Sequence, residues 1–186
     1  DYLYEISPES FWQGHKNAPT TLINTALDLM DLNIGDKVCD LYGGVGLFTM
    51  GISEIIGENG YVHLVESDDY ATNDARKIFK NHKNVLVRKG RVEKELPLVD
   101  SVDVILLDPP RNGAGSLVVD QMVSKKPRTI VYVSCDPASL ARDTKLLLEN
   151  NYSLDKIIAI DLFPMTHHIE CVAKFKQTTN LPKKSG

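Results

Sequence analysis

The chain has few cysteines. Its three cysteines, Cys39, Cys135 and Cys171, are an odd number with no C-x-x-C pair. That spacing builds neither a disulfide framework nor a zinc or iron–sulfur site within this chain. The adjacent histidines 167–168 would point to opposite faces of a strand, so we expect no metal site there. Unpaired cysteines lead us to expect reduced thiols and a cytoplasmic protein.

Long apolar runs and an excess of basic residues are also missing. No stretch approaches the roughly 18 consecutive apolar residues typical of a membrane span, and residues 1–5 lack the basic and apolar regions of a signal peptide. The 21 basic residues are outnumbered by 25 acidic ones, for a net charge of −4. We therefore do not expect the chain to bind nucleic acid by charge alone. It also lacks an initiator methionine, which suggests a piece of a longer protein.

What the sequence does contain is a regular alternation of strand and helix patterns. With 186 residues and 42% hydrophobic content, we predict one α/β domain over residues 1–177 and a flexible polar tail over 178–186. The alternation predicts a doubly wound, mostly parallel, seven-stranded sheet, and the short final link predicts an antiparallel C-terminal hairpin at one edge. Predicted strands are 37–42, 61–66, 85–89, 102–108, 129–135, 154–162 and 169–176; predicted helices run from about 18 to 30, 46–56, 70–81, 115–124 and 138–149.

A glycine-rich loop follows the first predicted strand. Its spacing, Asp40-x-x-x-Gly44-x-Gly46, fits the first loop of methyltransferases that use S-adenosylmethionine. A dinucleotide fingerprint would need a third glycine where Thr49 stands. Glu66 ends the second strand, where an acid accepts ribose hydroxyls in either kind of protein. A third interpretation, that the glycines serve only a tight turn, stays open.

Residues Asp108-Pro109-Pro110-Arg111 close a later apolar strand. The two prolines fix an extended exit and present Asp108 to the crevice at the strand ends. An enzyme that methylates an exocyclic amine would usually have an aromatic residue after the prolines, to stack the target base. Arg111 at that position weakens this alternative.

Cys135 is placed as a nucleophile would be. It ends an apolar strand immediately before Asp136-Pro137, and a helix N-terminus close by would favour its thiolate. Cys39 and Cys171 lie inside strand patterns and are expected in the core. Glu170, near the start of the last strand, could serve as a base or be an ordinary surface residue.

Taken together, these segments resemble the RNA (uracil-5-)-methyltransferase family, whose members form 5-methyluridine in transfer or ribosomal RNA. Five motifs carry the resemblance in order: 11–13, 40–46, 108–111, 131–138 and 161–170. The resemblance implies a Rossmann-like class I methyltransferase fold and an RNA substrate with a flipped or single-stranded uridine. It also implies that S-adenosylmethionine is the cofactor, that Cys135 is the nucleophile and Glu170 the base, and that Arg91 lies near the adenine. The cofactor would contact Gln13, Tyr42, Gly44, Gly46, Glu66 and Asp108.

The chain departs from the family pattern in three motifs, one of them at Gly14-His15, which differs from the commonest continuation of the motif around Gln13. Gly43 replaces a usual cysteine, and Asp136 replaces a usual asparagine, adding a negative charge expected to raise the pKa of the neighbouring thiol. The N-terminal RNA-binding domain common in the family, and the iron–sulfur cysteine cluster of some members, are not found here. We expect a monomer. Three alternatives stay open: an amine methyltransferase on the same fold, a catalytically silent cofactor-binding scaffold, and a dinucleotide-dependent oxidoreductase.

Overall fold

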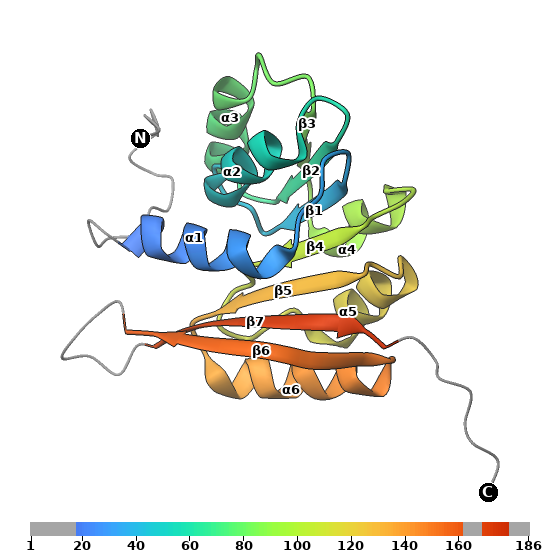
Figure 1. The fold of residues 1–186 in the computed structure, drawn as a ribbon. Helices are drawn as coiled ribbons and strands as arrows, with labels where there is room; N and C mark the ends of the chain where they lie inside the picture. The colour runs from blue at the N-terminus through green and yellow to red at the C-terminus, as the bar shows by residue number, and fades with distance from the viewer. Residues whose placement is uncertain (1–17, 162–168, 179–186) are drawn as a thin grey trace, which may run out of the picture.

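The computed structural model describes residues 18–161 and 169–178, which form one sheet flanked by helices (Figure 1). The strands are β1 (Lys37–Leu41), β2 (Tyr61–Glu66), β3 (Val85–Lys89), β4 (Val104–Leu107), β5 (Thr129–Ser134), β6 (Tyr152–Ile160) and β7 (Glu170–Gln177). The helices are α1 (Ala18–Met30), α2 (Leu47–Ile56), α3 (Asp69–Ile78), α4 (Val92–Glu95), α5 (Gly115–Ser124) and α6 (Pro137–Glu149), with a short 3-10 helix η1 (Leu96–Leu98).

The seven strands lie in the order β3-β2-β1-β4-β5-β7-β6. Strands β1 to β5 pair in parallel, whereas β7 pairs antiparallel with both β5 and β6. The chain leaves β5 through α6, passes over one position to form β6 at the edge, and returns to fill the gap with β7 (Figure 1). The predicted mostly parallel sheet with an antiparallel C-terminal hairpin is confirmed.

Two hydrophobic cores explain why the central strands are apolar without alternation. On β4, Val104 and Leu106 join the core beneath α1 and α2, whereas Ile105 and Leu107 join the core beneath α5 and α6. Every residue of β4 and β5 is buried. Continuous apolar runs are what a strand needs when helices cover both of its faces.

Two short elements, α4 and η1, are not predicted by the sequence pattern. Four- and three-residue helices are too short to show apolar periodicity. They are anchored by Val92 and Leu96, which are buried in the core beneath α5 and α6. This segment follows β3, so it adds a wall to the edge of the sheet where the parallel strands end.

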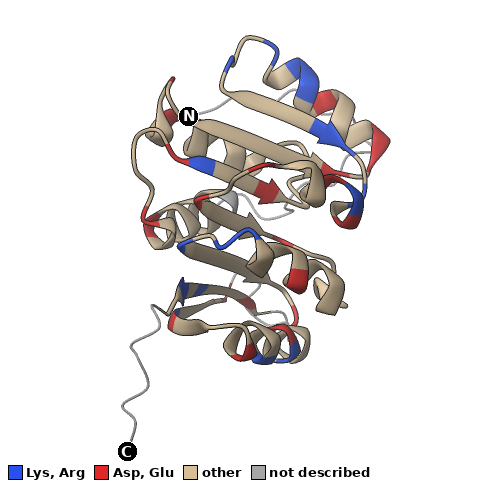
Figure 2. Ribbon diagram, turned by 90° about the vertical axis from the view of Figure 1, so that its right-hand side faces the viewer, with Lys and Arg blue, Asp and Glu red and all other residues tan. Residues whose placement is uncertain are grey.

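Charged residues are mixed over the surface of the described part. Figure 2 shows Lys and Arg interleaved with Asp and Glu along the helices and the strand ends. None of the helices in residues 18–161 and 169–178 is long and apolar enough to cross a membrane.

Candidate active site

Three predicted site residues stand on neighbouring strands at the same level. Strand β1 pairs in register with β2 and with β4 up to its last residue. The next position on each strand is occupied by Tyr42, Glu66 and Asp108. The parallel sheet therefore brings the predicted cofactor residues of three separate segments together at its carboxyl edge, where open α/β sheets bind ligands.

The glycines of the first loop have different roles. Gly44 and Gly46 both have positive φ angles, 54° and 92°. A side chain on Gly46 would collide with the ring of Phe79 and lie 3.0 Å from Leu64 Cδ1, so this glycine lets α2 pack closely against the end of α3. A side chain on Gly44 would meet no atom within 4 Å. Gly46 therefore serves packing, and Gly44 borders open space that a ligand can use.

Tyr42 adopts a conformation that a non-glycine residue rarely takes. Its φ is 59°, in the left-handed region. Such residues cost free energy, and they gather at functional sites where the surrounding structure holds them in place. Two backbone hydrogen bonds hold the turn that follows Tyr42: Gly43 N donates to Val65 O (3.1 Å), and Gly46 N donates to Gly43 O (2.8 Å).

The Glu66 carboxylate is fixed by backbone amides from two loops. Gly44 N donates to Oε2 at 3.0 Å, while Ser67 N and Asp68 N donate to Oε1 at 2.6 and 2.7 Å. A carboxylate offers about four acceptor sites, so Oε2 keeps capacity for a further donor. The orientation is thus set in advance for the hydroxyl groups of a ribose.

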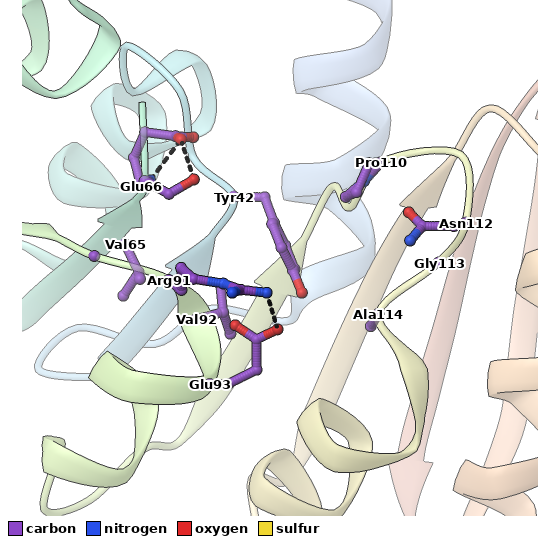
Figure 3. A pocket seen from close by; sticks show the side chains of 12 residues that line it. Tyr42, Val65, Glu66, Arg91, Val92, Glu93, Pro110, Asn112, Gly113 and Ala114 are labelled. Atoms are coloured by element: carbon purple, nitrogen blue, oxygen red, sulfur yellow. Dashed lines mark hydrogen bonds and ion pairs between the residues drawn. The ribbon is translucent and has the colours of Figure 1, made fainter. Parts of the chain in front are cut away.

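A cavity of about 200 Å³ opens between the loops that follow β1, β2, β3 and β4 (Figure 3). Tyr42, Glu66 and Arg91, three of the residues singled out from the sequence, line it. Its other walls come from α4 and from the loop after β4, through residues 90–93, 110 and 112–114. Glu93 was not predicted from the sequence because the four-residue helix α4 has no detectable pattern.

An ion pair closes one side of this cavity. Arg91 Nη2 lies 3.7 Å from Glu93 Oε1, and Figure 3 shows the pair beside the Tyr42 ring. Burial, with a smaller contribution from the Glu93 charge, raises the pKa of Tyr42 to about 12. Tyr42 therefore stays neutral at physiological pH and presents an aromatic face and a hydroxyl group.

The predicted nucleophile and base meet at the end of β5. Ser134 of β5 pairs with Cys171 of β7 in the antiparallel register, so the next residue of each chain segment brings Cys135 opposite Glu170. Cys135 is half-buried, whereas Cys39 and Cys171 are buried within strands. Glu170 is only 8% exposed, so it is not an ordinary solvated surface residue.

Two carboxylates and one guanidinium group lie within electrostatic reach of Cys135. Burial, followed by the Glu170 and Asp108 carboxylates, raises the pKa of the thiol, and Arg111 opposes this. The expectation that a helix N-terminus makes this thiol acidic is therefore wrong. Burial and two acidic neighbours outweigh it.

Asp136 does not act on the thiol as expected. Its carboxylate accepts hydrogen bonds from Ala138 N (3.3 Å) and Ser139 N (3.2 Å) and caps α6. These backbone bonds lower the pKa of Asp136. Asp136 is not among the groups that raise the pKa of Cys135, so the predicted effect of this departure was wrong.

Two acids with raised pKa values lie along the strand ends: Asp40 is buried and Asp108 is partly buried. Burial, and then the charges of Glu170 and Asp40, raises the pKa of Asp108 to about 8. Burial likewise raises the pKa of Asp40 to about 7, although Thr49 Oγ1 donates to its Oδ2 at 2.6 Å. Asp40 Oδ1 is buried with no hydrogen-bond partner among the described residues. An acceptor left unsatisfied beneath the glycine loop fits a site completed by a polar ligand or its water.

The structure thus brings together Tyr42, Glu66 and Arg91 around the cavity, and Asp108, Cys135 and Glu170 at the neighbouring strand ends. Gln13, also predicted to contact the cofactor, lies outside the described residues.

Comparisons with known proteins point to the same chemistry. Residues 87–178 match the sequence family described as tRNA (uracil-5-)-methyltransferase. The chain is 43% identical over 172 residues to an uncharacterized RNA methyltransferase of Streptomyces avermitilis, covering 91% of this chain and 40% of that protein. The structure of Pyrococcus abyssi tRNA (uracil-54, C5)-methyltransferase in complex with S-adenosyl-L-homocysteine superposes with a TM-score of 0.78 and 32% identity, over 92% of this chain and 41% of that one. Aeropyrum pernix fibrillarin with natively bound S-adenosyl-L-methionine shares the fold alone (TM-score 0.65, 19% identity, 89% of this chain and 85% of that one).

The sheet order, the first loop and the acid at the end of β2 define the Rossmann-like fold of methyltransferases that depend on S-adenosylmethionine. The open space at Gly44 and the acceptor on Glu66 fit that cofactor. More narrowly, the chain belongs to the RNA (uracil-5-)-methyltransferase family. It spans about two fifths of the length of the relatives it matches, with 40% and 41% coverage of the two just described.

Proposed function

We propose that this domain transfers a methyl group from S-adenosylmethionine to carbon 5 of a uridine in RNA, through a transient bond between Cys135 and carbon 6. The observation that carries the proposal is the position of Cys135 opposite Glu170, with Asp108 within electrostatic reach. The thiol and the largely buried carboxylate lie at the carboxyl edge of the sheet, where open α/β sheets bind ligands. They are the two groups that covalent methylation of a pyrimidine carbon requires.

The cavity between the strand-end loops is the proposed cofactor site. Glu66 would accept the ribose hydroxyls, and Tyr42 and Arg91 would lie along the remainder of the nucleoside. S-adenosylmethionine supplies an electrophilic methyl group on a sulfonium sulfur. The protein's task is to hold the uracil so that carbon 5 faces that methyl group.

Cys135 begins the reaction by adding to carbon 6 of the ring. The thiol loses its proton to water as the sulfur–carbon bond forms, and the electrons of the 5,6 double bond move toward carbon 5 and oxygen 4. Asp108, which is mostly protonated at pH 7 because its pKa is about 8, can donate a hydrogen bond to a ring carbonyl oxygen and stabilise the developing negative charge.

Glu170 completes the reaction as the base. Once carbon 5 carries both its proton and the new methyl group, the Glu170 carboxylate removes the proton. The electron pair of that bond restores the double bond, and the bond to Cys135 breaks to release the sulfur as a thiolate. The uridine must leave its base stack to reach a thiol at a strand end, so we propose a flipped or single-stranded uridine.

The RNA contacts come mainly from sequence outside these residues, in our proposal. The charge of −4 and the interleaved charges in Figure 2 provide little electrostatic attraction for a phosphate backbone. The proposal is consistent with relatives more than twice as long as this chain.

RNA that contains 5-fluorouridine tests the covalent step. After methyl transfer, carbon 5 carries fluorine instead of a proton, so Glu170 has nothing to remove and the protein should stay bonded to the RNA on a denaturing gel. Cys135→Ala should form no adduct, whereas Cys39→Ala, which changes a cysteine buried in β1, should form it normally. On unmodified RNA, Glu170→Gln should accumulate the methylated adduct.

Methylation of a bound RNA by the wild-type protein without any trapped adduct would overturn the proposal. Activity in Cys135→Ser would instead favour methylation of an exocyclic amine, which needs no thiol.

A further inference from the structure

A buried hydrogen-bonded cluster holds the loop that follows β4. Tyr132 of β5 donates its hydroxyl proton to Asp143 Oδ2 of α6 at 2.7 Å, and Ala114 N donates to the same oxygen at 2.7 Å. Gly115 N approaches it at 3.4 Å. Tyr132 is fully buried and Asp143 is 4% exposed. We call Tyr132, Asp143 and Ala114 the Asp143 clamp.

The loop held by this clamp is a wall of the proposed cofactor site. Pro110, Asn112, Gly113 and Ala114 all line the cavity (Figure 3). The loop lacks regular secondary structure between Asp108 and Gly115, so side-chain contacts must set its position. A carboxylate that accepts several buried donors at once is a strong way to do so.

Gly113 shows how closely the loop is fitted to the clamp. Its φ is +81°, and a side chain there would come within 2.7 Å of Asp143 Oδ2 and 3.2 Å of Ser139 Cβ. Only glycine allows the backbone to approach α6 so closely.

The side chain of Tyr132 lies on one face of the sheet, and the side chain of its neighbour Val133 lies on the other face. Tyr132 belongs to the core beneath α5 and α6, whereas Val133 belongs to the core beneath α1 and α2. The clamp reaches the cofactor cavity through Ala114, which both donates to Asp143 and lines the cavity.

We infer that Asp143 and Tyr132 are positioning residues that shape the S-adenosylmethionine site by holding residues 110–114 against the cavity. This inference rests on the cavity's assignment in the proposed function. It does not depend on which base is methylated, because cofactor binding can be measured without RNA.

Calorimetric titration of the full chain with S-adenosyl-L-homocysteine tests the inference. Tyr132→Phe removes one clamp hydrogen bond and should raise the dissociation constant about tenfold, the effect of roughly one buried hydrogen bond. Asp143→Ala should raise it further. Asp143→Asn, whose amide oxygen can occupy the place of Oδ2, should restore most of the affinity.

Tyr152→Phe is the matched control. Tyr152 is also buried and donates its hydroxyl proton to Pro127 O at 2.8 Å, away from the residues that line the cavity. Both tyrosine variants should lose similar thermal stability, but only Tyr132→Phe should lose affinity. In turnover assays, Tyr132→Phe should raise KM for the cofactor more than it lowers kcat.

Equal affinities for the two tyrosine variants would overturn the inference, since the clamp would then be only structural. If Tyr132→Phe fails to fold, Asp143→Ala compared with Asp143→Asn decides the question by the same titration. Lower affinity in Asp143→Ala than in Asp143→Asn supports the inference, and equal affinities overturn it. Failure of the fluorouridine trap would leave both results standing.

Discussion

The first loop offers a sharp test because Gly44→Ala and Gly46→Ala should fail for different reasons, and Gly35→Ala, outside the loop, serves as a reference. Gly46 has φ 92°, and an added methyl group would collide with Phe79 and press on Leu64. Gly35, in the turn between α1 and β1, has nearly the same φ of 90° but no neighbour within 4 Å of that position. The difference between Gly46→Ala and Gly35→Ala therefore isolates the collision from the backbone strain.

The two costs can be worked out separately. A left-handed alanine in place of glycine costs about 1–2 kcal/mol, which is all that Gly35→Ala should lose. A methyl group forced into a packed interior costs about 1–3 kcal/mol more. Gly46→Ala should therefore lose about 2–5 kcal/mol of unfolding free energy, a large part of the about 5–15 kcal/mol available to a typical domain. Urea denaturation followed by circular dichroism measures both losses.

Gly44→Ala completes the series through ligand binding. Its φ is 54° and its added methyl group would meet no protein atom within 4 Å, so its stability should fall only as much as that of Gly35→Ala. The methyl group would project beside the amide that donates to Glu66, so affinity for S-adenosyl-L-homocysteine should fall by about tenfold or more, as expected when one close contact is lost. Unchanged affinity in Gly44→Ala would refute the placement of the ligand at this loop. Equal stability losses in Gly46→Ala and Gly35→Ala would refute the packing role of Gly46.

Two further predictions concern buried charges. The pKa of Asp108 is raised to about 8 in the folded protein. As pH rises from the unfolded pKa to this value, the unfolded state loses the proton more readily than the folded state, so Asp108 increasingly destabilises the fold. In urea denaturation, the stability of Asp108→Asn relative to wild type should therefore be greater at pH 8 than at pH 5. Lys174 is buried and its Nζ lies 2.6 Å from Asp31, whose pKa it lowers. The charged Asp31 therefore stabilises the fold above its unfolded pKa, and this stabilisation is lost as pH falls through its lower pKa in the folded protein. In thermal melts, the loss of stability caused by Lys174→Met should therefore be larger at pH 6 than at pH 3.

The strands and their functional ends could be predicted because their signals are local. The apolar runs of β4 and β5 each stop at a proline-containing segment, and these stops located Asp108 and Cys135 at the sheet edge. The Asp136 effect was predicted wrongly, although a local signal was available. An Asp followed by Pro at the start of a helix is a typical N-cap and first-turn pattern, and a capping carboxylate is directed toward the helix amides.

The burial of Glu170 could not be predicted in the same way. Its neighbours in sequence do not reveal that β7 lies between β5 and β6, because that depends on pairings across the sheet. Once β7 occupies that position, Glu170 must lie opposite Cys135. Glu170 was therefore predicted as the base by family resemblance, whereas its environment follows only from the topology.

The side chains of β5 alternate between the two faces of the sheet, so this one strand can serve both substrates of the proposed reaction. Its end carries Cys135 to the edge where the uridine would bind, and Tyr132 anchors the loop beside the cofactor cavity from the opposite face. The hydrogen bonds that do this join residues 11 and 29 positions apart, so no local pattern reveals them. Because α6, which supplies Asp143, begins two residues after Cys135, the proposed nucleophile and the loop that lines the proposed cofactor cavity are both held by β5 and α6. That arrangement would keep the sulfur of Cys135 at a fixed position relative to the cavity.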